Sequence, residues 1–183
     1  ALAAILVAAA GASMSSRVLT LLDFDDPREV GLVRPIDDVV MGGVSASRFE
    51  LAAPGIARFA GMVSLANNGG FASVRSAARD WAAGGAEAFV VRAKGDGQQY
   101  KLTLRVDDGF DGLQYQARFT AGTEWSEIRL PVAQFQPSFR GRRVAGAPPL
   151  DPGKIRMLGF MISDRQDGEF SLEIDWIAVE LQP

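Results

Sequence analysis

The sequence predicts an all-β fold, an antiparallel β-sandwich of the jelly-roll type. Three observations predict this fold class. Several segments alternate apolar and polar residues with a period of two, which is typical of strands with one buried and one wet face. Turn-forming residues separate these segments, and glycine and proline supply 20 and 9 of the 183 residues. No segment has a long helical periodicity, so we expect under about 10% helix, against about 30–35% in an average protein.

The expected strands follow one another between turn signals. Segments 59–65, 100–106 and 113–119 alternate cleanly, whereas 88–93 and 158–162 are almost wholly apolar and indicate more fully buried strands. The segment 125–131 ends at a proline. The last segment, 170–181, changes its apolar parity between Trp176 and Ile177, which indicates a β-bulge or a strand that changes sheets. We also expect one helical turn at 79–83 and a long functional or mobile loop at 134–153.

We expect one sandwich domain over residues 19–183, preceded by a separate N-terminal stretch. Residues 1–18 are interpreted as a signal-peptide remnant or a disordered N-terminus. Ala1–Ala12 is apolar and uncharged, and its Ala10-Gly11-Ala12 end fits a small-residue cleavage site. The alternative is that Met14 is the true start. A remnant predicts a periplasmic or secreted protein, and otherwise a cytoplasmic one is expected. Twelve apolar residues are too few to span a bilayer, which takes about 20, so no transmembrane span is expected.

Composition excludes several classes of function. Asp and Glu total 22 against 19 Lys and Arg, so the net charge is -3 and no DNA partner is expected. The sequence has no His and no Cys, which excludes His-based catalytic triads, thiol nucleophiles, disulfides and zinc held by these residues. Acid–base chemistry would have to use Asp, Glu, Lys or Tyr. We expect no catalytic residue, no cofactor and no metal site.

Three segments are candidates for a binding rim at one end of the sandwich. They are DDVVMGGVS at 37–45, NNGGFASVR at 67–75 and the arginine-rich part of the long loop. Glycine pairs allow a partner to approach the backbone closely, and arginine is favoured at interfaces. The alternative is that these residues only form turns. The rim residues are Asp37, Asp38, Met41, Asn67, Asn68, Phe71, Phe139, Arg140 and Arg142.

Other polar clusters have weaker readings. The acidic segment 107–111 offers oxygen ligands for calcium, although it lacks EF-hand spacing and an acidic hairpin turn is favoured. Asp164 and Asp167 form a candidate carboxylate pair, which a simple turn explains equally well. Trp125, Phe110 and Phe139 fall in loops or at strand ends and are candidates for a sugar-stacking platform.

The order of several strings resembles the complex I intermediate-associated protein 30 family. DDVVMGGVS, NNGGFASVRS, KGDGQQYKLTLR, LPVAQFQPSFRGRRV and GFMISDRQDGEFSLEIDWI follow one another with fitting spacing over about residues 23–179. The resemblance implies a galactose-binding-domain-like jelly roll and a role in assembling respiratory complex I or in stabilising other complexes. It implies no settled catalytic residue. Within the matching motifs, Arg75, Asp96, Arg105 and Asp175 are expected to be structural and to pair with one another or with turn amides.

We therefore predict a non-enzymatic, chaperone-like binding or assembly module with a protein partner, in a bacterial chain. The alternative is a carbohydrate-binding module, and a third class is an enzyme that uses carboxylates alone. Exposed aromatic residues beside Asn, Asp or Arg would favour sugar binding. Two carboxylates that face one cleft would favour an enzyme.

Overall fold

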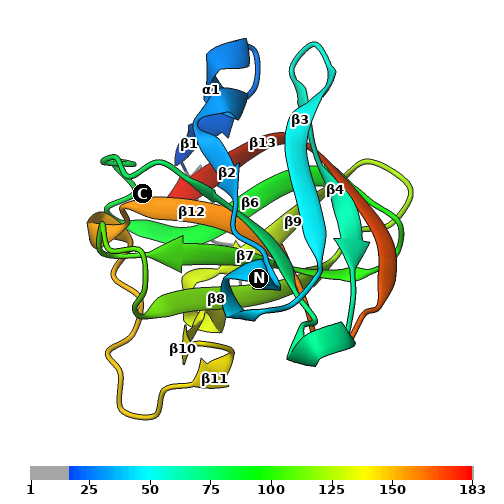
Figure 1. Ribbon diagram of the computed structural model, residues 1–183. Coiled ribbons are helices and arrows are strands. Elements are labelled where there is room, and N and C mark those ends of the chain that lie inside the picture. The colour runs from blue at the N-terminus through cyan, green and yellow to red at the C-terminus, as the bar shows by residue number, and fades with distance from the viewer. Residues whose placement is uncertain (1–16, 183) are drawn as a thin grey trace, which may run out of the picture.

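The computed structural model describes residues 17–182, which form two antiparallel sheets packed face to face (Figure 1). Ala1–Ala12 lies outside the described residues. One sheet has the order β3-β4-β13-β6-β9, with β1 beside β13, and the other has the order β11-β10-β8-β7-β12-β5-β2. The predicted all-β antiparallel sandwich is confirmed. The first strand begins at Arg17, two residues before the predicted start of the domain.

The six strands of the first sheet are β1 (Arg17–Asp23), β3 (Ala46–Ala53), β4 (Ile56–Val63), β6 (Ala86–Lys94), β9 (Ser126–Pro131) and β13 (Gly168–Leu181). The seven strands of the second sheet are β2 (Val33–Pro35), β5 (Ala72–Ser76), β7 (Gln99–Arg105), β8 (Gln114–Thr120), β10 (Gln136–Phe139), β11 (Arg142–Arg143) and β12 (Met157–Ile162). The helical elements are α1 (Pro27–Gly31) and four short 3-10 turns, η1 (Asp38–Met41), η2 (Ala66–Asn68), η3 (Val132–Gln134) and η4 (Pro152–Lys154).

The core lies between the sheets and follows the predicted alternation. On β7, Tyr100, Leu102 and Leu104 are fully buried against the other sheet. The alternate residues Lys101, Thr103 and Arg105 therefore face outward. Rings from both sheets pack edge to face, and β8 and β12 alternate in the same way. The seven-stranded sheet thus has one apolar face and one polar outer face.

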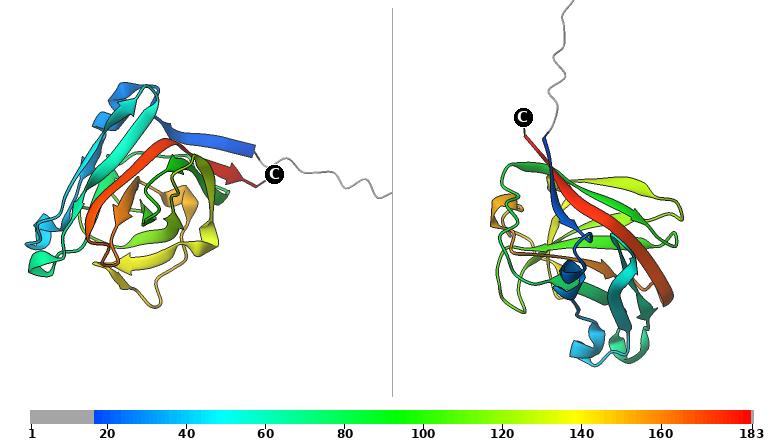
Figure 2. Two further views of the ribbon diagram at one scale, coloured as in Figure 1. Left: turned by 90° about the vertical axis from the view of Figure 1, so that its right-hand side faces the viewer. Right: turned by 90° about the horizontal axis from the view of Figure 1, so that it is seen from above.

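The parity change near the end of the chain is a β-bulge, which was one of the two predicted explanations, and not a strand that changes sheets. The register of β13 against β6 shifts between Ile174 and Trp176. Ile174 and Ile177 are both fully buried as a result. The strand stays in one sheet: it pairs with β4 up to Ile174 and with β1 from Trp176 onward (Figure 2).

The structure corrects one expectation about helix and contains one helix that was not expected. Residues 79–83 hold no helical turn, because Ala82 has a left-handed φ of 51° and Arg79 and Trp81 both donate to the carbonyl of Arg156. The α-helix in residues 17–182 is α1, of five residues, which sequence periodicity is too short to show. Its local signal is Asp26 before Pro27: the Asp26 side chain caps the helix, and proline suits its first turn.

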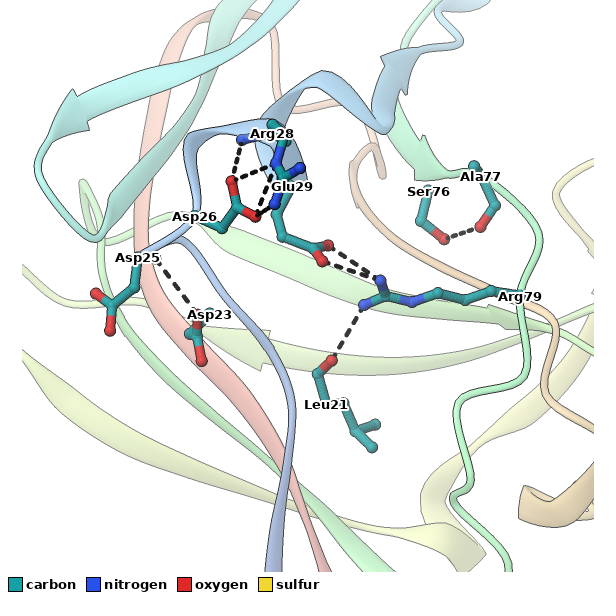
Figure 3. Close-up of polar contacts among 9 residues, drawn as sticks. All are labelled: Leu21, Asp23, Asp25, Asp26, Arg28, Glu29, Ser76, Ala77 and Arg79. Atoms are coloured by element: carbon teal, nitrogen blue, oxygen red, sulfur yellow. Dashed lines mark hydrogen bonds and ion pairs between the residues drawn. The ribbon is translucent and has the colours of Figure 1, made fainter.

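Arg79 holds α1 against the sandwich (Figure 3). Its Nη1 lies 3.1 Å from both carboxylate oxygens of Glu29 in α1, and its Nη2 donates to the carbonyl of Leu21 in β1 at 3.2 Å. The guanidinium also stacks on the ring of Trp81, at 3.8 Å from the centroid. One side chain therefore joins the helix, the first strand and the 79–83 connection.

The expected long loop at 134–153 is partly regular secondary structure. It contains the short strands β10 and β11, which extend the seven-stranded sheet beyond β8. In Figure 1 these strands lie at the bottom of the sheet, beside the outer face described next. Their connection carries Arg140 and Gly141.

Candidate functional site

The outer face of the seven-stranded sheet carries a pocket of about 460 Å³. Its floor consists of outward-facing side chains of β5, β7, β8 and β12. Its walls come from five connections: η1, the segment between η2 and β5, and the loops between β7 and β8, between β10 and β11 and between β12 and β13. Turns far apart in the sequence thus converge on one sheet face, as functional loops on a rigid scaffold commonly do.

The floor is cationic and largely shielded from water. Lys101 is 6% exposed and Arg105 is 3% exposed, although both lie on the outer face of β7. Lys101 donates to Asp164 at 2.8 Å and to Ser163 at 2.6 Å. Arg105 donates to Asp107 at 2.7 Å. The surrounding loops therefore cover these two charges and supply one carboxylate to each.

Arg75, on β5, lines the same pocket. Its Nη1 donates to the carbonyl of Phe110 at 2.9 Å, and Arg105 donates to that same carbonyl at 3.1 Å. Gly112 leaves room for this arrangement, because a Cβ at this position would lie 2.6 Å from Nη2 of Arg105. The φ of Gly112 is 154°, which also favours glycine. Burial and the neighbouring charge of Arg105 lower the pKa of Arg75.

Exposed apolar side chains border this cationic floor. Val39, Val40 and Met41 of η1 are 62%, 59% and 62% exposed, and Phe110 on the opposite wall is 68% exposed. Phe71 also lines the pocket. Solvent-exposed apolar clusters of this kind, beside polar groups, mark sites of interaction with a partner or ligand.

The carboxylate of Asp38 holds η1 in place. It is 1% exposed and accepts hydrogen bonds from the amide and hydroxyl of Ser45 and from the amides of Gly70 and Phe71. Burial opposes ionisation, but these hydrogen bonds outweigh it and keep the pKa of Asp38 below its ordinary value. A Cβ at Gly43 would lie 2.3 Å from Oδ1 of Asp38, so only glycine fits there.

Asp37 makes a second link in the same region. Its carboxylate accepts from the amide and hydroxyl of Ser47 at 2.8 and 2.7 Å and from the amide of Ser73 at 3.0 Å. The two adjacent carboxylates thus tie η1 to β3, to β5 and to the turn before β5. Together they hold Val39, Val40 and Met41 outward.

These contacts correct part of the predicted rim. Asp38 is buried and its oxygens are used inside the fold, so it is not a rim residue. Asn67 and Asn68 are exposed, but both have left-handed φ values, 54° and 60°, which asparagine tolerates. They form the turn of η2 and do not line the pocket. The structural alternative considered for these segments therefore explains Asp38 and both asparagines.

Three predicted rim residues come together around the pocket, and two stand apart. Met41, Phe71 and Arg140 line it. Arg140 donates through Nε to Asp111 on the neighbouring wall at 3.1 Å, and both hold exposed positions. Phe139 is 41% exposed and lies against the Arg140 guanidinium at 5.2 Å, and Arg142 is exposed on β11, but neither lines the pocket.

The four residues expected to be structural do not pair with one another, but Asp96 does accept from a turn amide, as the second alternative predicted. Asp96 accepts from the amides of Gln98 and Ser171 and from the hydroxyl of Tyr100. Asp175 pairs with Arg92 at 2.9 Å. Arg75 and Arg105, by contrast, belong to the pocket. Sequence reasoning assigned these two to the scaffold and missed Lys101 altogether.

A usable signal for the floor was present in the sequence. Lys101, Thr103 and Arg105 occupy the polar positions of the clean alternation at 100–106, so they had to share one face of one strand. What the alternation does not reveal is that loops far away in the chain cover this face. The pocket itself therefore depended on tertiary structure.

The acidic segments are occupied by internal partners. Asp107 accepts from Arg105 and from the amide of Gly109, and Asp108 pairs with Arg156 at 2.7 Å. Asp167 accepts from the amide of Leu65 and does not act as the second carboxylate of a pair with Asp164. Within residues 17–182, no group of three acidic residues is placed to hold a metal ion. In this same range no helix is long and apolar enough to cross a membrane.

Of the candidate stacking aromatics, Phe110 alone lines the pocket. Trp125, at the start of β9, lies near the cations of Arg92 and Lys94, at 5.8 and 5.2 Å from its ring centroid. Phe139 stands on β10 outside the pocket. A single flat row of aromatic platforms therefore does not form.

Solved structures confirm the fold. The family 11 carbohydrate-binding module of a cellulosomal cellulase of Clostridium thermocellum superposes with a TM-score of 0.68, over 92% of this chain and 96% of that one, at 14% identity. An exo-β-agarase matches with a TM-score of 0.56 over 90% of this chain and 26% of its own, at 9% identity. At these identities the likeness concerns the sandwich fold alone.

Curated relatives carry one family name. A mouse protein, complex I intermediate-associated protein 30, mitochondrial, is 33% identical over 130 residues, covering 68% of this chain and 38% of the relative. The fruit fly protein of the same name is 27% identical over 167 residues, covering 77% and 55%. The chain thus spans between about a third and just over half of these relatives. Both are eukaryotic mitochondrial proteins, which contradicts the expectation of a bacterial chain.

The family model for complex I intermediate-associated protein 30 matches residues 22–174, which runs from β1 to Ile174 of β13 and includes every pocket wall. This match covers most of the chain and agrees with the motifs noted in the sequence. The chain belongs to the complex I intermediate-associated protein 30 family.

Proposed function

We propose that this domain is a non-enzymatic binding module that holds part of a protein partner in the outer-face pocket while a multisubunit complex assembles. The relatives are named for intermediates of complex I, and we extend that role to this chain. The observation that supports the proposal most is the exposed apolar segment Val39–Met41, fixed by a buried carboxylate beside a cationic floor. Three consecutive apolar side chains in solvent do not stabilise the isolated fold, and such exposed apolar surface marks a site of interaction with a partner.

The chemistry of the pocket favours binding over catalysis. Its two lining carboxylates, Asp111 and Asp164, are both ion-paired. Burial opposes ionisation of Asp164, but hydrogen bonds from Arg118 and Lys101 outweigh it and lower its pKa. The hydrogen bond from Arg140 lowers the pKa of Asp111. A general acid needs a raised pKa near the working pH, so neither carboxylate suits that role.

The test compares two aspartate substitutions of exposed apolar residues. Met41→Asp alters the pocket border, and Leu51→Asp, on β3 in the other sheet, is the matched control at 39% exposure. The unfolding free energy of both variants should lie within about 0.5 kcal/mol of that of the parent. Affinity-tagged parent protein should recover subunits of a complex I assembly intermediate from cells of the source organism.

Met41→Asp should reduce that recovery at least tenfold, and Leu51→Asp should leave it unchanged. Equal recovery by all three proteins would place the working surface elsewhere. Recovery of no complex I subunit by the parent would contradict the proposed role itself.

Carbohydrate binding is the second candidate, because Phe110 is 68% exposed beside the outward-facing Gln114 and Gln116. Aromatic faces next to amides are the groups that sugar sites use. One solved neighbour is recorded in complex with a β-1,3-1,4-mixed-linked tetrasaccharide. Calorimetric titration with that tetrasaccharide decides the matter: we expect no measurable heat of binding, and a saturable heat that Phe110→Ala abolishes would favour the sugar.

A further inference from the structure

Of the four cations that line the pocket, three pair with a carboxylate of the described residues and one does not. Lys101 pairs with Asp164 at 2.8 Å, Arg105 with Asp107 at 2.7 Å, and Arg140 with Asp111. Arg75 is the fourth cation that lines the pocket. Among residues 17–182, no carboxylate lies within ion-pair distance of it, and the Phe110 carbonyl is its hydrogen-bond acceptor.

The donors at the floor also outnumber the acceptors. Arg75 and Arg105 share the one carbonyl of Phe110. In the part of the chain that the structure describes, the buried Nε of Arg105 has no hydrogen-bond partner. Burial, and then the repulsion between two guanidinium groups that meet at one oxygen, lowers the pKa of Arg75. An anion beside Arg75 would offset the charge of both guanidinium groups and offer Arg75 further acceptor oxygens.

We propose that Arg75 anchors a binding site for a carboxylate group of the partner polypeptide, with Arg105 as the charge behind it. The planar fork of arginine donors fits a carboxylate in a bidentate manner. The inference depends on the proposed function in one respect only, namely that the carboxylate comes from a protein.

A carboxylate fits the surroundings better than a phosphate does. Arg75 is the lining cation without a carboxylate partner among residues 17–182, and a monoanion matches its single charge. A phosphate dianion would also face the carboxylates of Asp107, Asp111 and Asp164, which lie around the same floor. Apolar side chains also line the pocket, Met41 and Phe71 on the walls and Met161 on the floor, and they suit the hydrocarbon part of a peptide.

The shape of the surface fits an extended chain. A second hollow, of about 470 Å³, adjoins the pocket and shares Lys101, Gln116, Gly141 and Asp164 with it. It continues over β8 toward β10 and β11, where Gln136, Ser138 and Arg143 line it. A segment whose carboxylate reaches Arg75 can therefore lie across the strands, with further residues in the second hollow.

The experiment follows the arginine side chains by NMR. The full chain, labelled with 15N-arginine, is titrated with phenylacetate and, in parallel, with the neutral isostere phenylacetamide. We expect the side-chain Nε–H signals of Arg75 and Arg105 to shift saturably with phenylacetate, and at least tenfold weaker binding of phenylacetamide. Arg75→Gln should weaken phenylacetate binding at least tenfold.

Two further variants keep this test decisive. Arg75→Lys retains the charge without the planar fork and should weaken binding about threefold, and it serves if the Gln variant does not fold. Arg48→Gln removes an exposed arginine on β3, which pairs with Glu50 at 3.0 Å, and should bind phenylacetate as the parent does. Saturable shifts that persist unchanged in Arg75→Gln would overturn the assignment.

The remaining arms separate the sources of the anion. Acetylated Leu-Phe with a free C-terminal carboxylate, and an amidated tripeptide with an internal glutamate, represent the two carboxylates of a protein, and tighter binding of either one than of phenylacetate supports the proposal. Tighter binding of inorganic phosphate than of phenylacetate would overturn it. If phenylacetate binds and neither peptide does, the carboxylate site stands and its protein source is wrong. Failure to recover complex I subunits, by contrast, bears on the proposed function alone.

Discussion

Asp38 is a single residue that shapes a surface from beneath. Its carboxylate is surrounded by four hydrogen-bond donors, and glycines at 43 and 69 leave the space that it fills. Because the carboxylate satisfies these buried donors, the neighbouring turn can leave its three apolar residues in solvent. A residue that carries no ligand contact can thus determine where a ligand binds.

Asp38→Asn should destabilise the protein by about 2–4 kcal/mol at pH 7, because an amide nitrogen would face buried N–H donors and leave them unsatisfied. The pKa of Asp38 is lowered on folding. Its stabilisation is therefore fully present above the unfolded-state value, about 3.9, and is lost as the pH falls through the lower folded-state value. Urea unfolding at pH 7 and at pH 3 measures the difference between variant and parent.

That difference should shrink at the lower pH. The exposed Asp25, substituted by Asn, is the matched control, and it should change the unfolding free energy by less than about 0.5 kcal/mol at either pH. A gap between Asp38→Asn and the parent that is as large at pH 3 as at pH 7 would show that charge plays no part in holding η1.

At the scale of elements, the helix α1 depends on the contacts of one distant arginine. A five-residue helix has too few internal hydrogen bonds to be stable alone. Arg79 supplies what it lacks through Glu29, the Leu21 carbonyl and the Trp81 ring. No local sequence pattern indicates this contact, because the partners of Arg79 lie 50 and 58 positions away in the chain.

Arg79→Ala should lower the unfolding free energy by about 1–2 kcal/mol, through loss of the stacking on Trp81 and of partly exposed hydrogen bonds. Arg28→Ala on the same helix is the control. That side chain is 89% exposed and its pairing with Asp26 should contribute almost nothing. Chemical denaturation of both variants measures the effect, and equal stability of the two would mean that α1 is held by other contacts.

The same scale separates what periodicity can and cannot predict. The strand 100–106 and the bulge near Trp176 follow from the spacing of apolar residues, since each strand buries alternate positions. The short strands β10 and β11 within 134–153 do not, because edge strands of two to four residues carry no clear alternation. Likewise, Asn67 and Asn68 predict a turn from the sequence alone. The need for glycine around Asp38 is visible only in the structure, where η1 and the turn before β5 come together.

At the scale of the whole molecule, the two faces of the seven-stranded sheet differ in role: one packs the core and the other carries the pocket. The inner face of β5, β7, β8 and β12 packs the core, and the outer face of the same strands presents cations under a cover of loops. The fold class and the polar side of each strand were predictable from the sequence. Part of the site was predictable as well: Met41, Phe71 and Arg140 as rim residues and Phe110 as a stacking candidate all line the pocket. The cations of its floor were not, because alternation alone does not show that distant loops cover them.

The most direct test of the central claim, that this outer face is the working surface, is site-specific photo-crosslinking. A photo-reactive amino acid is placed at Met41 and, as the control, at Leu51, and crosslinked proteins from cells of the source organism are identified by mass spectrometry. We predict that Met41 crosslinks subunits of a complex I assembly intermediate and that Leu51 does not. Crosslinks to such subunits from Leu51 with none from Met41 would contradict the account and place the partner on the other sheet.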